Sequence, residues 1–383
     1  MNILADENIP YVRDAFGPLG NVTTISGRVI DRAAVSDAHL LLVRSITRVN
    51  RELLDGSAVR FVATATIGED HIDKAYLAES GIGFSSAPGS NANSVGQYIT
   101  GALLALAERF ELDLEKMKLG IVGVGHVGSI VEKRATALGL TCVLNDPPLA
   151  RVTGDAKYRP IEEIFDCDIV TLHVPLTKSG EDATYHLADD AFIRNLKPGA
   201  ILMNSSRGAV ADGVAISRAL DDGHLRACVL DVWEGEPNID VSLLEKVFIG
   251  TPHIAGYSFD GKVNGTRQIY EAACKFLGID ATWDAAPLLP APECPSVNVD
   301  GNNPNAVLDT VRAVYDIMDN DAAMRRLLPA TAEERPALFD RLRKEYPRRR
   351  EFHNTCITVS PLNPKLEACL SGIGFTVEKG NNA

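Results

Sequence analysis

The sequence predicts an α/β protein built on parallel sheets, and three observations support this prediction. Short apolar segments alternate with helical or polar stretches as far as about residue 280. A glycine-rich loop of the form G-x-G-x-x-G lies between one of these apolar segments and a helical pattern. The chain of 383 residues is also longer than one ordinary hydrophobic core allows, so we expect two or three domains.

The first 92 residues predict one small α/β unit. Its expected strands are NILAD, NVTTI, LLLVRS, RFVATAT and IGFSSA, separated by helical or polar connectors. The next stretch, Asn93 to Arg109, is rich in Ala and Leu and predicts a connecting helix with Asn91 or Asn93 near its cap. A second amphipathic helix is expected downstream, over FDGKVNGTRQIYEAACKFLG.

The glycine loop lies in KLGIVGVGHVGSIVEKRATALGL, which begins with a strand pattern and continues as a helix to about Gly139. In such a loop Gly123 permits a tight turn, Gly125 lets a pyrophosphate approach the backbone, and Gly128 lets helix and strand pack closely. The free N–H groups at the helix start attract phosphate. We therefore expect a dinucleotide to contact Gly123, Gly125, His126, Val127 and Gly128.

An acidic residue follows this loop at the distance that ribose binding requires. A second strand, TCVLN, ends at Asp146, 18 residues after Gly128. A carboxylate there accepts hydrogen bonds from both ribose hydroxyls and repels a 2′-phosphate. The expected cofactor is therefore NAD rather than NADP.

Three polar residues follow buried-strand patterns further along the chain. Arg207 lies in NSSRGAV, Glu236 in DVWEGEP and His253 in GTPHIAG, with spacings of 29 and 17 residues. An arginine binds a carboxylate with two parallel N–H bonds, and a histidine exchanges a proton with a secondary alcohol. Glu236 would stabilise the charged histidine. The set predicts an active site for hydride transfer at the strand ends of one sheet.

Each of these three residues also has a structural interpretation. An arginine before a glycine is often a solvated turn residue, and the histidine could be a buried, hydrogen-bonded group. Glu236, between Gly235 and Pro237, could be an ordinary loop charge. The repeated placement after the strand patterns GAILMN, ACVLDVW and KVFIGTP favours the catalytic interpretation.

The C-terminal part predicts a separate small module. Residues 281 to 296 are rich in proline and predict a linker. Beyond it, SVNVD, CITVS and FTVEK predict strands with helices between them, and no glycine loop or metal-ligand cluster is present in this stretch of sequence. The basic run RLRKEYPRRR, residues 341 to 350, predicts a solvated helix face, with phosphate contacts as the alternative.

Composition excludes several classes of protein. The chain has 51 acidic against 38 basic residues and a net charge of −13, which argues against nucleic acid as its main partner. Seven scattered cysteines without a C-x-x-C pair predict reduced thiols and no metal site. The start of the chain lacks the features of a signal peptide and no run reaches membrane length, so we expect a cytoplasmic protein with no membrane partner.

The motifs together resemble those of the D-isomer-specific 2-hydroxyacid dehydrogenases. The similar segments are GIVGVGHVG, LHVPLT, MNSSRGAV, LDVWEGEP and TPHIAG, in matching order and spacing. Other segments are similar to one subgroup that acts on a phosphorylated 2-hydroxy acid: ILADENIP, LLVRSITRVN, ATATIGEDHID, APGSNANSV, HIAGYSFDGK and LLPAPE. With the tail included, the resemblance extends over nearly the whole chain.

This resemblance implies roles for particular residues. Arg207 would bind the substrate carboxylate, His253 would exchange the proton and Glu236 would support it. Further positions are implied for substrate at Ser45, Thr66 and Tyr257, and for cofactor at Asp146, Asp231 and Gly256. For the phosphate we favour Arg44 over Arg48, because Arg44 directly follows a strand pattern, although salt bridges would explain both arginines equally well.

The resemblance also implies a domain plan and leaves two rival functions. Residues 1–92 with 256–285 would form a flavodoxin-like substrate (lid) domain, 93–255 a Rossmann-type doubly wound NAD-binding domain, and 286–383 a small α/β dimerisation domain. Closure between the first two domains would exclude water. The rivals are another enzyme of this family, such as phosphoglycerate dehydrogenase, and a non-enzymatic NAD-sensing protein.

Overall fold

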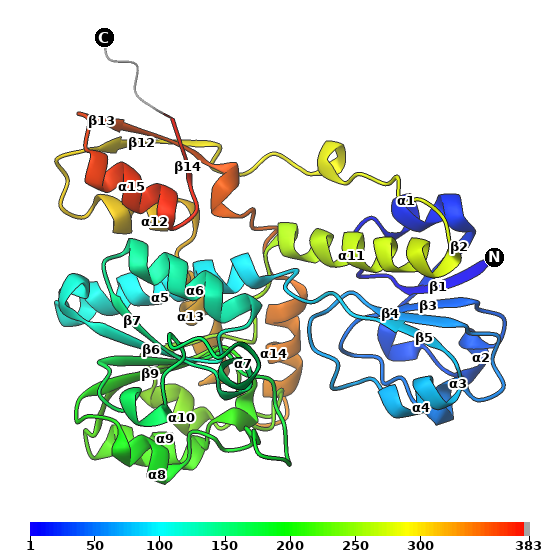
Figure 1. The fold of residues 1–383 in the computed structure, drawn as a ribbon, viewed down its shortest axis with the longest axis horizontal. Coiled ribbons are helices and arrows are strands. Elements are labelled where there is room, and N and C mark those ends of the chain that lie inside the picture. The colour runs from blue at the N-terminus through cyan, green and yellow to red at the C-terminus, as the bar shows by residue number, and fades with distance from the viewer. Residues whose placement is uncertain (379–383) are drawn as a thin grey trace. The chain divides into compact units, whose positions relative to one another are not determined.

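A computed structural model describes residues 1–378 of the chain, in two compact units. The first unit combines residues 1–91 with 258–291, and the second combines 92–257 with the described residues from 292 onward. All three sheets in the described part are parallel α/β arrangements, as the sequence predicted (Figure 1). The division into three domains stays a prediction.

The first unit contains a five-stranded parallel sheet in the order β2-β1-β3-β4-β5. Its strands are β1 (Asn2–Asp6), β2 (Asn21–Ile25), β3 (Leu40–Val43), β4 (Phe61–Thr64) and β5 (Gly83–Ser85). Its helices are α1 (Val12–Phe16), α2 (Arg32–Val35), α3 (Arg51–Leu54), α4 (Lys74–Glu79) and α11 (Phe259–Leu277). The four residues of β3 are fully buried, because helices cover both faces of a parallel sheet.

The second unit contains a six-stranded parallel sheet in the order β11-β10-β9-β8-β6-β7. Its strands are β6 (Lys118–Val122), β7 (Thr141–Asn145), β8 (Ile169–Leu172), β9 (Ala200–Asn204), β10 (Leu225–Leu230) and β11 (Ile249–Gly250). The direction of strand succession reverses between β6 and β8, so this sheet is doubly wound. In such sheets ligands bind beyond the carboxyl ends of the strands at the reversal.

Helices cover this sheet and include the expected connecting helix. They are α5 (Ala92–Phe110), α6 (His126–Ala137), α7 (Pro147–Thr153), α8 (Asp190–Asn195), α9 (Gly213–Asp221) and α10 (Val241–Lys246). Helix α5 agrees with the predicted stretch 93–109. The helix begins directly after Asn91, which agrees with the predicted cap position, although the Oδ1 atom of Asn91 is buried without a hydrogen-bond partner.

The C-terminal part forms a three-stranded parallel sheet in the order β12-β13-β14. Its strands are β12 (Ser296–Asp300), β13 (Cys356–Ser360) and β14 (Thr376–Val377), and its helices are α12 (Ala306–Val314), α13 (Ile317–Met324), α14 (Arg335–Lys344) and α15 (Pro364–Gly372). The predicted strand FTVEK is shorter than expected, and its Lys379 lies outside the described residues.

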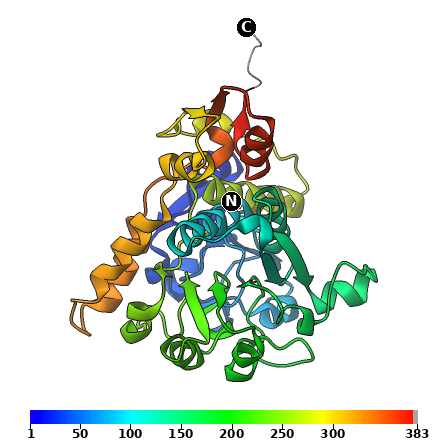
Figure 2. The same ribbon diagram turned by 90° about the vertical axis from the view of Figure 1, so that its left-hand side faces the viewer.

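The C-terminal segment shares its hydrophobic cores with the six-stranded sheet. Phe352 and Ile357 pack in one cluster with residues of α5 and α6, while Phe339 of α14 packs in another with residues of β9 and β10. Figures 1 and 2 both show the C-terminal sheet lying over α5 and α6. Cores of this kind explain why residues 292–378 cluster with the second unit.

Candidate active site

The glycine loop joins β6 to α6 with the geometry that a dinucleotide requires. Gly123 has a φ of +87°, and a Cβ atom there would lie 2.7 Å from the carbonyl oxygen of His173. A Cβ atom on Gly128 would lie 2.1 Å from the carbonyl oxygen of Gly123, so helix and strand meet too closely for any side chain. Beside Gly125 there is open space. The residues present therefore fit a bound pyrophosphate.

Helix α6 begins at His126 without a side-chain cap, so its first N–H groups are not occupied by a capping side chain. Gly125 and His126 are exposed and Val127 is half-buried. Asp146 follows β7 as predicted, and its carboxylate accepts from the backbone N–H of Val124 at 2.8 Å and of Leu149 at 3.0 Å. One carboxylate thus fixes both the glycine loop and the start of α7.

His253 and Glu236 lie in contact. The imidazole Nδ1 of His253 and the Oε1 of Glu236 are 2.5 Å apart, and the second carboxylate oxygen accepts from the N–H of Trp233 at 3.3 Å. Because Nδ1 is occupied, the Nε2 atom is the nitrogen left for a substrate, and no described residue hydrogen-bonds it. This contact agrees with the pairing that the sequence suggested, and the catalytic role of the two residues stays a prediction.

The charge of Glu236 is favoured by its surroundings. Burial alone would raise its pKa, but the hydrogen bond from His253 and the positive charges of His253 and Arg343 lower the pKa below its ordinary value. Glu236 is therefore an anion at neutral pH. An anion on Nδ1 stabilises the imidazolium that forms when Nε2 accepts a proton.

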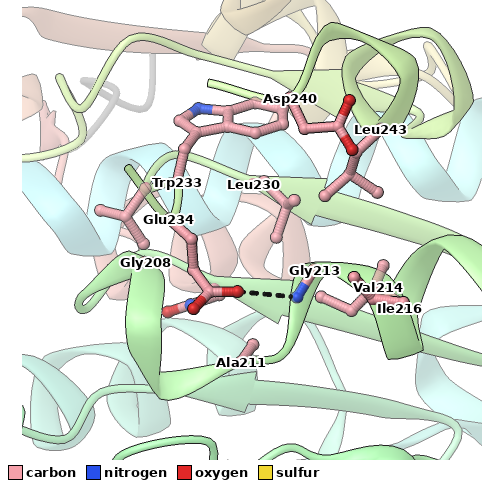
Figure 3. Close-up of a pocket in the computed structure, with 12 residues that line it drawn as sticks. Gly208, Ala211, Gly213, Val214, Ile216, Leu230, Trp233, Glu234, Asp240 and Leu243 are labelled. Carbon is pink, nitrogen blue, oxygen red and sulfur yellow. Dashed lines mark hydrogen bonds between the residues drawn. The ribbon is translucent and has the colours of Figure 1, made fainter. Parts of the chain in front are cut away.

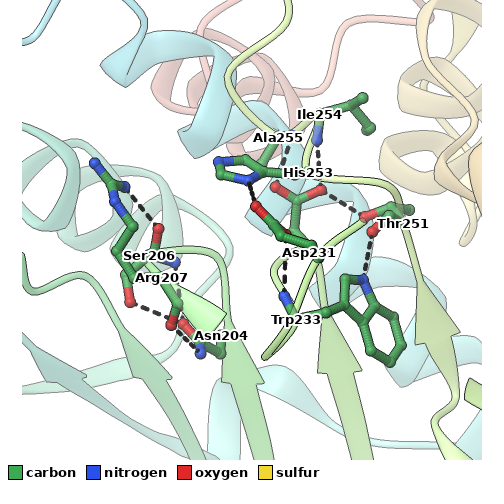
Figure 4. Close-up of polar contacts among 10 residues, drawn as sticks. Asn204, Ser206, Arg207, Asp231, Trp233, Thr251, His253, Ile254 and Ala255 are labelled. Atoms are coloured by element: carbon green, nitrogen blue, oxygen red, sulfur yellow. Dashed lines mark hydrogen bonds and ion pairs between the residues drawn. The ribbon is translucent and has the colours of Figure 1, made fainter. Parts of the chain in front are cut away.

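Arg207 lies at the end of β9, beside the strand that leads to Glu236. Its Nη1 atom donates to the carbonyl oxygen of Ser206 at 2.8 Å, and the carbonyl oxygen of Arg207 accepts from the Asn204 side chain at 3.0 Å. Figure 4 shows Arg207 and His253 on the same side of the strand ends, with the His253 ring turned toward the side where Arg207 lies. The guanidinium and the imidazole thus share one end of the sheet, as the sequence predicted.

Asp231 is buried and organises the loop that carries His253. Its carboxylate accepts from the hydroxyl of Thr251 and the N–H of Ile254, both at 2.7 Å, and from the N–H of Ala255 at 2.9 Å (Figure 4). Burial raises the pKa of Asp231, and these donors oppose the rise. His253 itself has a φ of +58°, a conformation that is uncommon outside glycine and that this network holds in place.

Two residues that the sequence did not single out also support the site. The buried hydroxyl of Tyr98 lies 2.8 Å from the hydroxyl of Thr251, which continues the Asp231 network into α5. His173 follows β8 and contacts Thr171 at 3.0 Å, and burial lowers its pKa to about 3, so it is neutral at physiological pH. The motif LHVPLT could have pointed to His173, whereas no local pattern marks Tyr98.

The remaining predicted substrate residues divide between the two units. Arg44, Ser45 and Thr66 belong to the first unit, where Arg44 is half-buried after β3 and Ser45 is exposed. The hydroxyl of Thr66 lies 2.7 Å from that of Thr64. In the second unit Tyr257 is half-buried, one residue after the half-buried Gly256.

A second histidine–carboxylate pair lies in the same unit as His253. The Nε2 atom of His186 and the Oε1 atom of Glu234 are 2.7 Å apart, and the other oxygen of Glu234 accepts from the N–H of Gly213 at 3.1 Å. Figure 3 shows Glu234 reaching Gly213 at a cavity of about 110 Å³. Apolar side chains supply much of its lining, among them Ala211, Val214, Leu230, Trp233 and Leu243.

Metal and membrane features are absent from the part of the chain that the structure describes. Residues 1–378 contain no group of three or more His, Cys, Asp or Glu side chains that could hold a metal ion. Within the same residues, no helix is sufficiently long and apolar to span a bilayer.

Comparison with known proteins places this site in a family. Residues 98–255 match the model "D-isomer specific 2-hydroxyacid dehydrogenase, NAD binding domain", and residues 288–374 match a domain of unknown function. Proteins named erythronate-4-phosphate dehydrogenase from Escherichia coli O17:K52:H18 and Escherichia coli O6:K15:H31 are each 48% identical to the chain over 354 residues, 92% of both lengths.

Solved structures are similar to this chain in fold. The TT0316 protein of Thermus thermophilus has a TM-score of 0.62 at 26% identity and covers 73% of this chain and 98% of its own. The fold of 3-phosphoglycerate dehydrogenase from Entamoeba histolytica, solved with NAD+, has a TM-score of 0.62 at 24% identity, covering 73% of this chain and 95% of its own. The chain therefore belongs to the D-isomer specific 2-hydroxyacid dehydrogenases and, within them, to the proteins named erythronate-4-phosphate dehydrogenase.

Proposed function

We propose that the protein oxidises the C2 hydroxyl of 4-phospho-D-erythronate to 2-oxo-3-hydroxy-4-phosphobutanoate, with NAD as cofactor. The His253–Glu236 contact carries this proposal, because it leaves an imidazole nitrogen ready to accept a hydroxyl proton. The names of the relatives supply the substrate. This reaction assigns the chain to pyridoxal 5′-phosphate (vitamin B6) biosynthesis.

In this mechanism Arg207 binds the substrate carboxylate through two parallel hydrogen bonds and so fixes the orientation of C2. The Nε2 atom of His253 accepts the hydroxyl proton while the C2–O bond becomes a carbonyl. Glu236 keeps Nδ1 protonated and stabilises the positive ring. When bound, NAD supplies the acceptor for the hydride that leaves C2.

Cofactor and substrate contacts complete the proposal. We assign NAD contacts to Asp146, to Asp231 and to the backbone of Gly256. Further NAD contacts are assigned to the residues of the glycine loop, which are Gly123, Gly125, His126, Val127 and Gly128. Asp231 would act through the loop that it organises as well as near the nicotinamide. Substrate contacts are assigned to Arg44, Ser45, Thr66 and Tyr257.

The direct test is the growth of the NADH absorbance band in a mixture of protein, NAD and 4-phospho-D-erythronate. We expect NADH to form with this substrate and much more slowly with unphosphorylated D-erythronate. Preferential turnover of 3-phosphoglycerate would favour another enzyme of the family. A lack of NADH with every 2-hydroxy acid, together with NAD binding, would favour a non-enzymatic sensor.

We also propose that the protein is a cytoplasmic homodimer that associates through its C-terminal segment. The relevant measurement is the molar mass in solution by light scattering. A monomer at assay concentrations would contradict the dimer, without bearing on the chemistry of the site.

A further inference from the structure

The basic run 341–350 does not form the uniformly solvated face that the sequence predicted. Arg341, Lys344 and Arg348 are exposed, but Arg349 is buried and Arg343 is half-buried. The two covered arginines have different surroundings, and the difference separates a structural residue from a candidate ligand-binding residue.

Arg349 has a structural role. Its guanidinium donates through Nη1 to the Oε1 of Gln97 and through Nη2, at 2.7 Å, to the hydroxyl of Ser94, and it lies 4.3 Å from the centroid of the Tyr315 ring. Ser94 in turn donates to the carbonyl oxygen of Ala255 at 2.7 Å. Both terminal nitrogens therefore donate hydrogen bonds within the protein. These bonds link the tail to α5 and, through Ser94, to the loop that carries His253 and Ala255.

Arg343 instead lies beside the active-site residues. It is on the last turn of α14, whose Phe339 is anchored in the core of the six-stranded sheet. Its guanidinium carbon is 5.8 Å from the ring centroid of Tyr257, and it donates to the hydroxyl of that tyrosine. Its positive charge also acts on Glu236, the partner of His253.

The donors of Arg343 are not all used in this arrangement. A guanidinium has five N–H donors, and the Nε atom of Arg343 is buried without a hydrogen-bond partner. Two acidic groups act on its charge, Glu236 and Asp340. The Nε atom of Arg349 is buried and unpartnered in the same way, so this atom does not distinguish the two residues. Arg343 differs because its side chain is only half-buried, beside both a predicted substrate residue and the His253–Glu236 pair, which suits an anionic ligand with several oxygens, such as a phosphate.

We propose that Arg343, supplied by the C-terminal segment, binds the phosphate group of the substrate together with Tyr257. This inference deepens the proposed function and depends on it. The tail lies beyond the residues that match the family model of the NAD-binding domain. The proposal gives this tail a role in substrate specificity. The sequence suggested Arg44 as a phosphate-binding residue, and this proposal adds Arg343 as a second one.

The test compares Arg343→Met with Arg341→Met, which removes an exposed charge two residues away on the same helix. We expect Arg343→Met to lower kcat/KM for 4-phospho-D-erythronate about 10- to 100-fold, as for the loss of charge-assisted hydrogen bonds. Its kcat/KM for unphosphorylated D-erythronate should stay within about threefold of wild type. Arg341→Met should change neither value.

Equal losses for both substrates would overturn the proposal, because Arg343 would then act only through Glu236 or the fold. Unchanged kinetics in Arg343→Met would also overturn it. If Arg343→Met fails to fold, Arg343→Lys keeps the charge without the planar fork and should show a smaller loss, again confined to the phosphorylated substrate. If wild type forms no NADH with either substrate, the proposed function itself fails.

Discussion

Two histidine–carboxylate pairs in the second unit are alike in contact distance, exposure and backbone conformation. They differ in the ring nitrogen that the carboxylate contacts. His253–Glu236 and His186–Glu234 have contacts of 2.5 and 2.7 Å. The two histidine side chains are 29% and 30% exposed, and both backbones have positive φ values, +58° and +50°. Distance, burial and backbone conformation therefore do not distinguish the pair that we propose to be catalytic from the other pair.

The distinguishing feature is which ring nitrogen the carboxylate occupies. Glu236 binds Nδ1 of His253, whereas Glu234 binds Nε2 of His186, and the ring of Tyr185 stacks on His186 at 4.2 Å. The other oxygen of Glu234 accepts from Gly213, so this pair joins segments around a small cavity. The comparison teaches that the proposed active site is distinguished by the ring nitrogen left free and its surroundings, rather than by the presence of a histidine–carboxylate pair.

The largest expected effect comes from His253→Asn. Loss of the proton acceptor should lower kcat about 100- to 10,000-fold, the usual contribution of general acid–base catalysis. The affinity for NADH, followed by fluorescence titration, should stay close to wild type. Turnover at the wild-type rate would show that the two pairs have been assigned the wrong way round.

A smaller loss is expected for Glu236→Gln, which keeps the shape but removes the charge from Nδ1. We expect kcat to fall roughly 10- to 100-fold, because the imidazolium loses its stabilising anion. Glu234→Gln is the matched variant, and an equal kinetic loss there would remove the distinction between the pairs.

Acid stability provides a test that does not depend on turnover. The pKa of Glu236 is lower in the folded protein than in the unfolded chain, so its stabilising effect is present above an ordinary carboxyl pKa of about 4.3. It is lost as the pH falls through the lower native value. Urea unfolding should therefore show a shallower acid decline in Glu236→Gln than in wild type, while the exposed Glu245→Gln should match wild type. Parallel curves for Glu236→Gln and wild type would contradict the assigned shift.

The smallest kinetic effect is expected for His186→Asn. Because this pair joins segments of chain, its loss should lower the free energy of unfolding by roughly 1 kcal/mol, discounted for partial exposure. The value of kcat should stay within about threefold of wild type. A catalytic loss comparable to that of His253→Asn, with normal stability, would mean that His186 takes part in the reaction.

The sequence predicted much of the fold and the main site for physical reasons. Strand and helix patterns, the glycine loop and residues after strand ends are local signals, and they located Gly123, Asp146, Glu236 and His253 correctly along the sheet. Side-chain partners far apart in sequence leave no such signal. Arg349 is 252 residues from Gln97, so a basic run that looked solvated contains a buried arginine.

The His186–Glu234 pair also shows what local sequence signals do not predict. Glu234 and Glu236 are two residues apart, and no periodicity tells which of them meets a histidine with a free Nε2. Nor does the sequence indicate that Asp231 accepts three hydrogen bonds from the loop that carries His253. Such assignments depend on tertiary geometry, which composition and spacing do not encode.

The most direct test of the central claim, that His253 and Glu236 act as one unit, is a double-mutant cycle on the rate of NADH formation. The variants are His253→Asn, Glu236→Gln and the combination, each measured with saturating NAD and 4-phospho-D-erythronate. We predict that the double variant is no slower than His253→Asn alone, because Glu236 acts through the ring. Losses that multiply in the double variant would show that the two residues act independently, and would contradict this account.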